Sequence, residues 1–225
     1  MKNLKSLIIV GFLISSNLFA IGGFGIYGGQ GMFTVASTED NNPIATVTTG
    51  EFSNPYQVGL YLYIDAIPFI DIEVDIQVTG SEYTFDFSND FGTAGPYDTF
   101  WGGVSTYLTL RKKIVGFGIP MLGGAKLHAG AGYNMHSFGP LANLDLVESL
   151  MGDLSADPDF SEDKLIEFVK DNKIDVTGFH VQAGLQFKLL MLDSFLIYRY
   201  TFGDFEDVMD AEAFGSISLR IGIGI

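Results

Sequence analysis

The sequence predicts an all-β fold, an eight-stranded antiparallel up-and-down transmembrane β-barrel with a long, partly helical acidic loop between strands five and six. Eight segments alternate between apolar and polar residues with a period of two, which is typical of strands whose two faces meet different surroundings. After the N-terminal segment, no apolar run reaches the ~20 residues that a membrane-spanning helix requires. Long and short connections alternate along the chain, as they do in outer-membrane barrels.

The N-terminal segment, residues 1–20, reads MKNLKSLIIVGFLISSNLFA and predicts a signal peptide, which leaves residues 21–225 as the barrel domain. Lys2 and Lys5 precede the apolar stretch from Leu7 to Ile14, and Leu18-Phe19-Ala20 is an acceptable cleavage site. The alternative is a membrane anchor, but the apolar run is shorter than a spanning helix. We therefore expect an exported chain.

The first two strands are predicted over residues 22–35 and 56–67. The first is rich in glycine and weakly patterned. The second alternates clearly: its aliphatic positions, Val58, Leu60, Leu62 and Ile64, oppose Gln57, Gly59, Tyr61, Tyr63 and Asp65. Such a strand has one apolar and one polar face.

The third strand opens with IDIEVDIQV, residues 70–78, in which aliphatic side chains alternate with acidic and amide side chains. Further along, the aromatic residues Tyr83, Phe85 and Phe87 fall on odd positions, where the acidic residues were. A β-bulge moves the following residues to the other face of a strand. We expect such a bulge near Gly80-Ser81.

The remaining strands are predicted over residues 99–110, 124–138, 179–188, 196–202 and 213–225. In the last of them Ile217, Leu219, Ile221, Ile223 and Ile225 oppose Ser218, Arg220, Gly222 and Gly224. Long or polar connections lie near residues 36–55, 88–98, 139–175 and 203–212. Tight turns lie near residues 68–69 and 190–194, and the connection at 111–123 is longer than this pattern prefers. One rim thus carries long loops and the other mostly short turns.

The loop at residues 139–175 contains two short segments with apolar residues at helical spacing. They are Leu144, Val147, Leu150, Met151 and Leu154, and, after a Ser161 cap, Leu165, Ile166, Phe168 and Val169. Their apolar faces are candidates to pack on the rim, to cap the lumen or to bind a partner. Packing on the rim is the usual role of an amphipathic helix.

A soluble exported barrel or sandwich with a dry core would alternate in the same way, so the polar face decides between water and lipid. Soluble surfaces are rich in Lys, Glu, Asp and Arg. Here the polar face is largely Gly, Ser, Thr, Gln and Tyr. Small residues suit the crowded interior of an eight-stranded barrel, which side chains fill. The sequence therefore favours lipid at the apolar face.

The charges on the polar face balance. By parity this face carries Asp65, Asp71, Glu73 and Asp75 against Lys126, Lys188, Arg199 and Arg220. Buried charges need partners, because an unpaired one costs several kcal/mol. We expect these residues to form a structural charge network in the lumen.

The other charges are segregated between the rims. Ten carboxylates lie between residues 139 and 175 and five between 204 and 212, whereas Arg111, Lys112 and Lys113 adjoin a short-turn connection. The acidic loops are candidate sites for divalent cations. A net charge of −15 and the lack of a basic stripe exclude nucleic acid as a partner. The aromatic residues near the long loops predict an interfacial girdle: Tyr56, Tyr83, Phe85, Phe100, Trp101, Tyr133, Phe179 and Phe202.

From GGFGIYGGQGMF through KLHAGAGYNM to SISLRIGIGI, the mature chain resembles the small outer-membrane β-barrel proteins of diderm bacteria, the OmpA/OmpX/OmpW-like group. The resemblance rests on pattern and covers the whole mature chain. It implies an eight-stranded barrel in the outer membrane, with the outer-membrane lipid and the assembly machinery as partners. The family's last strand commonly ends in an aromatic residue, whereas this chain ends in Ile225.

Candidate chemistry is sparse. His128, His136 and His180 fall on the polar face, and His136 and His180 would lie near each other at the outer rim, where they are candidate metal ligands. His136-Ser137 is the only local candidate for lipid-acting catalysis, but no orienting acid or oxyanion donors accompany it. The sequence thus predicts no catalytic or cofactor site, and hydrogen-bonded lumen histidines are the simpler interpretation.

Two functions are compatible with this pattern. The first is a non-enzymatic structural or surface-exposed outer-membrane barrel with a filled lumen and acidic extracellular loops. The second is passage or binding of a small apolar molecule, which would enter through the rim or a lateral gap.

Overall fold

The computed structural model describes residues 22–65, 70–119, 123–152, 154, 168 and 171–224. The predicted signal peptide, the tight turn at 68–69 and nearly all of the second predicted loop helix lie outside the described residues. Among the described residues, no helix is long and apolar enough to cross a membrane.

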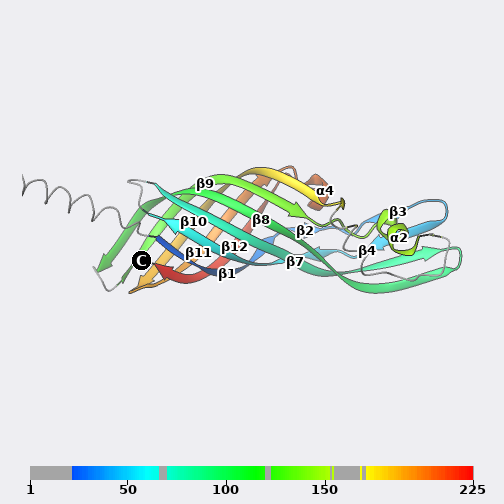
Figure 1. Ribbon diagram of the computed structural model, residues 1–225, viewed down its shortest axis with the longest axis horizontal. Coiled ribbons are helices and arrows are strands. Elements are labelled where there is room, and N and C mark those ends of the chain that lie inside the picture. The colour runs from blue at the N-terminus through cyan, green and yellow to red at the C-terminus, as the bar shows by residue number, and fades with distance from the viewer. Residues whose placement is uncertain are drawn as a thin grey trace, which may run out of the picture.

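Eight antiparallel strands close into a ring (Figure 1). Neighbours along the ring are also neighbours in the sequence, and β12 pairs with β1 to close it, with Gly224 opposite Gly23 and Gly215 opposite Met32. The predicted antiparallel up-and-down barrel is therefore confirmed. Its members are β1 (Gly22–Met32), β6 (Tyr56–Ile64), β7 (Asp71–Asn89), β8 (Gly92–Ile119), β9 (Gly123–Phe138), β10 (Ile174–Leu189), β11 (Leu192–Gly203) and β12 (Ala213–Gly224).

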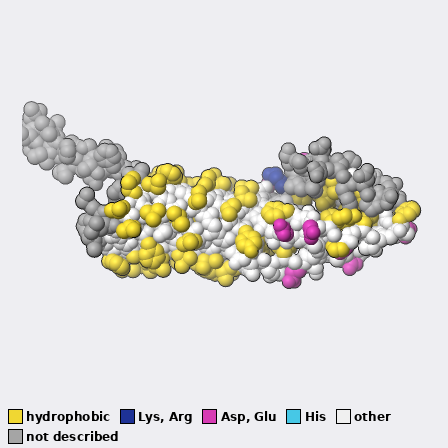
Figure 2. All heavy atoms as spheres, turned by 90° about the horizontal axis from the view of Figure 1, so that it is seen from below, with side chains coloured by type: hydrophobic (Ala, Val, Ile, Leu, Met, Phe, Trp, Pro, Cys, Tyr) yellow, Lys and Arg dark blue, Asp and Glu magenta, His cyan; other side chains and the backbone are white. Residues whose placement is uncertain are grey.

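The two faces of each strand meet different surroundings, as the alternation predicts. On β6, Leu60 is 59% exposed while its neighbour Tyr61 is 3% exposed. Aliphatic side chains therefore point outward and polar ones point into the lumen. Figure 2 shows the result, a belt of hydrophobic side chains along the barrel and acidic side chains only toward the end that carries β3, β4 and α2 in Figure 1.

The strands β7 and β8 continue past the ring at the long-loop end and form an extension (Figure 1). The strand β4 (Ala45–Thr49) pairs with the far part of β7, and β3 (Glu39–Asn41) pairs with β4. Beside them β2 (Thr34–Val35) pairs with β5 (Phe52–Ser53). The predictions of loops at 36–55 and 88–98 were thus wrong in part. The strands within 36–55 are too short for alternation to reveal them, and residues 88–98 form the end of the long hairpin of β7 and β8.

The predicted bulge near Gly80-Ser81 is absent. Pairing of β7 with β8 runs without a shift from Asp71 to Phe85, and the irregularity lies between Phe85 and Phe87. Tyr83 and Phe85 consequently point to the same inner side as Asp75. The face stays the same while its chemistry changes, because the inner side faces a polar lumen within the ring and an apolar core in the extension.

Two helices are described at the long-loop end. The helix α2 (Leu144–Met151) begins after Asn143, whose side chain accepts a hydrogen bond of 2.8 Å from the Leu146 N–H, and it ends at Gly152, whose φ of 83° is left-handed. This is the first helix that the sequence predicts. The helix α4 (Glu206–Met209) was not predicted, because one turn gives no periodic signal.

The long-loop mouth of the barrel is filled by an apolar cluster, which we call the mouth core. Trp101 stacks on Phe138 with ring centroids 5.3 Å apart, and α2 buries its apolar face in the same cluster. The mouth core consists of Val35, Ala45, Val47, Phe52, Tyr83, Phe85, Phe87, Trp101, Phe138, Ala142, Leu144, Leu146, Val147, Leu150, Leu154, Phe168, Val176, Phe205, Val208, Met209 and Phe214.

The aromatic girdle is therefore smaller than predicted. Tyr56, Phe100, Tyr133 and Phe179 are exposed on the outer wall. Tyr83, Phe85 and Trp101 instead belong to the mouth core, since they occupy inward positions.

Candidate functional site: a charge network in the lumen

Glu73 and Asp75 of β7 meet two arginines of β11 and β12 in the middle of the lumen. The two terminal nitrogens of Arg220 lie 3.0 and 2.9 Å from the two oxygens of Asp75, and its Nη1 lies 2.9 Å from Glu73. Arg199 also donates to Asp75. All of these side chains are buried. Strand alternation positions them, since each occupies an inward site of its strand.

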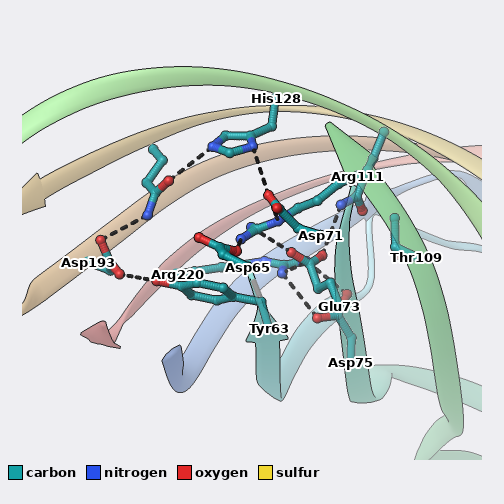
Figure 3. A network of polar contacts seen from close by, with 12 residues as sticks. Tyr63, Asp65, Asp71, Glu73, Asp75, Thr109, Arg111, His128, Asp193 and Arg220 are labelled. Carbon is teal, nitrogen blue, oxygen red and sulfur yellow. Dashed lines mark hydrogen bonds and ion pairs between the residues drawn. The ribbon is translucent and has the colours of Figure 1, made fainter. Parts of the chain in front are cut away.

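Arg111 of β8 forms the second half of the network (Figure 3). Its Nη1 lies 3.0 Å from Glu73, its Nη2 3.1 Å from Asp65 and its Nε 3.6 Å from Asp71. Its guanidinium also lies 4.3 Å from the centroid of the Tyr63 ring. The prediction that Arg111 belongs with the lysines at a turn was wrong. Position 111 continues the inward series of Tyr107 and Thr109, and this parity could have revealed it.

Lys126 and Lys188 lie elsewhere. Both line a pocket at the short-turn end of the barrel, and neither reaches ion-pair distance of a carboxylate in the described part of the chain. Of the predicted charge network, the structure thus brings together Asp65, Asp71, Glu73, Asp75, Arg199 and Arg220 and leaves the two lysines at the short-turn end.

Asp193 joins the network, although its place in a predicted turn hid it from sequence reasoning. It accepts a hydrogen bond from the Tyr63 hydroxyl and one of 2.9 Å from Gln186. Gln186 in turn lies 3.0 Å from His128, and Figure 3 shows this chain of contacts leading from Asp193 to His128 and Asp71. The turn between β10 and β11 is only two residues long, so Asp193 already belongs to β11.

Neutral side chains complete the network. Gln182 donates a hydrogen bond of 2.9 Å to Glu73 and accepts one of 3.0 Å from Arg199. The Arg199 guanidinium lies 3.8 Å from the centroid of the Tyr107 ring. Cation–π contacts and shared amides stabilise charges that are removed from water.

His136 and His180 lie between the network and the mouth core. His136 forms a hydrogen bond with the Ser105 hydroxyl and His180 with the Thr109 hydroxyl, each 2.8 Å long. Their rings flank Tyr107 at 5.4 and 5.2 Å between centroids. Instead of meeting at the rim, they are buried in the lumen. No group of three His, Cys, Asp or Glu that could hold a metal ion occurs among the residues that the structure describes.

Close packing joins these parts. Tyr27 lies against Gly59 so closely that a Cβ at position 59 would come within 2.5 Å of its ring. The Tyr27 hydroxyl donates to Gln77 at 3.2 Å. Higher up, His136 stacks on Phe138 of the mouth core at 5.6 Å. The lumen is therefore occupied by side chains from the network to the mouth.

Tyr83 lies in the extension, beyond Glu82, the first charged side chain that β7 presents outward. Burial raises the pKa of the Tyr83 phenol above its usual value. Its oxygen accepts a hydrogen bond of 2.9 Å from the Ala142 N–H, which ties the start of the 139–175 loop to β7. The loop is thereby anchored to the mouth core.

A closed ring, an aliphatic exterior and a charge-filled interior define a membrane-embedded β-barrel. Closure leaves no strand edge to lipid within the ring, and lipid-facing residues alternate with lumen-facing ones.

No protein-family profile matches the chain, and no curated protein matches it. Among solved structures, Ail, the attachment invasion locus protein of Yersinia pestis, is similar at 14% identity and a TM-score of 0.42, covering 92% of this chain and 99% of Ail. The outer membrane protein OprG from Pseudomonas aeruginosa has 13% identity and a TM-score of 0.43, covering 91% of this chain and 94% of OprG. Neisserial surface protein A has 14% identity and a TM-score of 0.42, covering 91% and 96%. The class assigned above rests on the geometry of the barrel itself.

Proposed function

We propose that the protein is a non-enzymatic barrel of the outer membrane of a diderm bacterium, with a structural or surface-exposed role. The observation that carries this proposal is the filled lumen. Arg199 and Arg220 cross it at the level of Asp75, and the mouth core lies above them. An eight-stranded barrel has just enough interior for side chains.

The exterior supports the location. Bacterial membrane barrels with short turns at one rim and long loops at the other reside in the outer membrane. In this proposal the aliphatic belt contacts outer-membrane lipid, the assembly machinery inserts the barrel, and the long loops face outward. Their carboxylates are candidate ligands for divalent cations; those at residues 157–163 lie outside the described residues.

The surroundings of the histidines support a non-enzymatic role. Ser137 is adjacent to His136 in a strand, so the two side chains point to opposite faces. His136 and its actual partner Ser105 are both buried beneath the mouth core. A substrate would have to displace packed aromatic rings to reach them.

Planar-bilayer recording tests this role. We expect the protein reconstituted from detergent to produce no conductance steps, because the arginines, their carboxylate partners and the mouth core occupy the lumen. A porin recorded under the same conditions is the positive control. Regular, reproducible steps from the purified protein would contradict the proposal and favour passage.

One observation favours the second candidate, binding of a small apolar molecule. A groove of about 410 Å³ on the outer wall is lined mainly by apolar residues, with Ser81 and Glu82 beside them: Tyr56, Val58, Val78, Gly80 and Phe100. It lies where a molecule arriving laterally from the membrane would meet the barrel. Uptake of an apolar tracer into vesicles that contain the barrel, above that of empty vesicles, would support this candidate; equal uptake would exclude passage.

A further inference from the structure

The short-turn end of the barrel carries a basic pocket of about 270 Å³. Lys113, Lys126 and Lys188 line it, and none of its described lining residues is acidic. The whole chain has 12 Lys and Arg against 27 Asp and Glu. Three lysines therefore line one pocket of an acidic protein, although Asp193 lies opposite Lys188 in the pairing of β10 with β11.

The pairing of the strands explains why this pocket is open. Within the described residues β7 begins at Asp71, opposite Arg111, whereas β8 and β9 continue together to the pair of Ile119 with Gly123. Over this stretch β8 therefore pairs with β9 but not with β7, whereas β9 stays paired with β10 as far as Gly123 opposite Leu189. Lys126 and Lys188 occupy lumen-facing positions of β9 and β10. Gln186, opposite Lys126, donates a hydrogen bond of 2.9 Å to Asp193.

The outer side of the same end is apolar. Val115 and Phe117, in the part of β8 that does not pair with β7, are 62% and 78% exposed. In the turn between β10 and β11, Leu190 and Met191 are 62% and 61% exposed. Exposed apolar patches mark surfaces that contact a membrane or a partner. A surface that is apolar outside and cationic inside suits the boundary between acyl chains and headgroups, where lysines reach toward the polar layer.

We propose that this pocket binds the phosphate headgroup of an acidic membrane lipid in the leaflet at the short-turn end. The lysines neutralise the phosphate, and Phe117 and Leu190 contact the acyl chains. Basic pockets at the membrane surface recognise such headgroups by the same charge complementarity. The proposal goes beyond the role of the barrel, and it would stand even if conductance were found.

Native mass spectrometry of the whole folded barrel in mild detergent tests it. The protein is titrated with phosphatidylglycerol and, separately, with phosphatidylcholine of the same acyl chains. We expect phosphatidylglycerol to bind more tightly. Substituting Lys113, Lys126 and Lys188 by Gln should weaken its binding by roughly fivefold for each lysine, toward the level of phosphatidylcholine.

Two variants control for folding and for general charge. The triple Lys→Arg variant should keep the preference, and Lys112→Gln, on the opposite face of β8, should leave it unchanged. A change in electrophoretic mobility between heated and unheated samples of each variant shows that the variant is folded. Equal binding of the two lipids, or an unchanged preference in the triple Gln variant, would overturn the proposal. Displacement of the lipid by an equal concentration of inorganic phosphate would overturn the assignment to a lipid.

Discussion

Arg220 binds two carboxylates at once in the centre of the barrel, at 1% exposure. Glu73 and Asp75 lie two residues apart on the inward face of β7, so they would repel each other without a cation between them. Arg199 and Arg111 bind the same pair from either side. The interior is therefore stable only when both carboxylates and all three arginines are present.

We predict that Arg220→Ala destabilises the barrel by about 3–5 kcal/mol, because it leaves buried carboxylates without their partner. Urea unfolding in lipid vesicles measures this loss. The matched control is Lys173→Ala, which removes an exposed ion pair with Asp175. Exposed pairs contribute about 0–1 kcal/mol. Equal stability of the two variants would contradict a network held by Arg220.

Among the elements, β7 has an inward face that contacts two different environments along its length. Glu73 and Asp75 face the charge network, and further along Tyr83, Phe85 and Phe87 face the mouth core. The helix α2 covers this apolar part with Leu144, Val147 and Leu150. The described residues 139–152 of this loop therefore pack over the mouth through α2.

We predict that Val147→Asp opens the mouth core while the ring stays folded. Val147 is 0% exposed, and a buried unpaired carboxylate costs several kcal/mol. Limited proteolysis should cut the 139–175 loop about 100-fold faster, which corresponds to about 3 kcal/mol of local stability. Ser149→Asp places the same group on the exposed side of α2 and should change the rate little. Similar cleavage of both variants would mean that α2 does not seal the mouth.

At the scale of the whole molecule, the closed antiparallel barrel with its apolar exterior could be predicted from the sequence, because a period of two extends over eight strands. The inward direction of Asp65, Asp71, Glu73, Asp75, Arg199 and Arg220 followed from the same parity. The ion-pair partners of these residues could not be predicted, because parity gives the face of a strand but not the height of a residue along the barrel. Lys126 and Lys188 share the face of Arg199 yet lie nearer the short-turn end.

The extension and the mouth core escaped prediction for a different reason. Inward aromatic residues on β7 have the same pattern as lipid-facing ones, so Tyr83 and Phe85 indicated a bulge. Only the three-dimensional course of β7 and β8 past the ring shows that a second, apolar core receives these side chains. Asp193 was missed because the turn before it is only two residues long, and the sequence does not show where this turn ends and β11 begins.

The central claim is that the aliphatic exterior contacts hydrocarbon, and spin-label accessibility in lipid vesicles tests it directly. The chain has no Cys, so single cysteines can be introduced at Leu60, Ile76 and Leu219 of the belt and at Glu39 and Asn41 of the extension, all exposed. We predict that labels in the belt collide with oxygen and not with a water-soluble nickel chelate, and that labels in the extension show the reverse. Equal collision of both sets with the chelate would contradict the account.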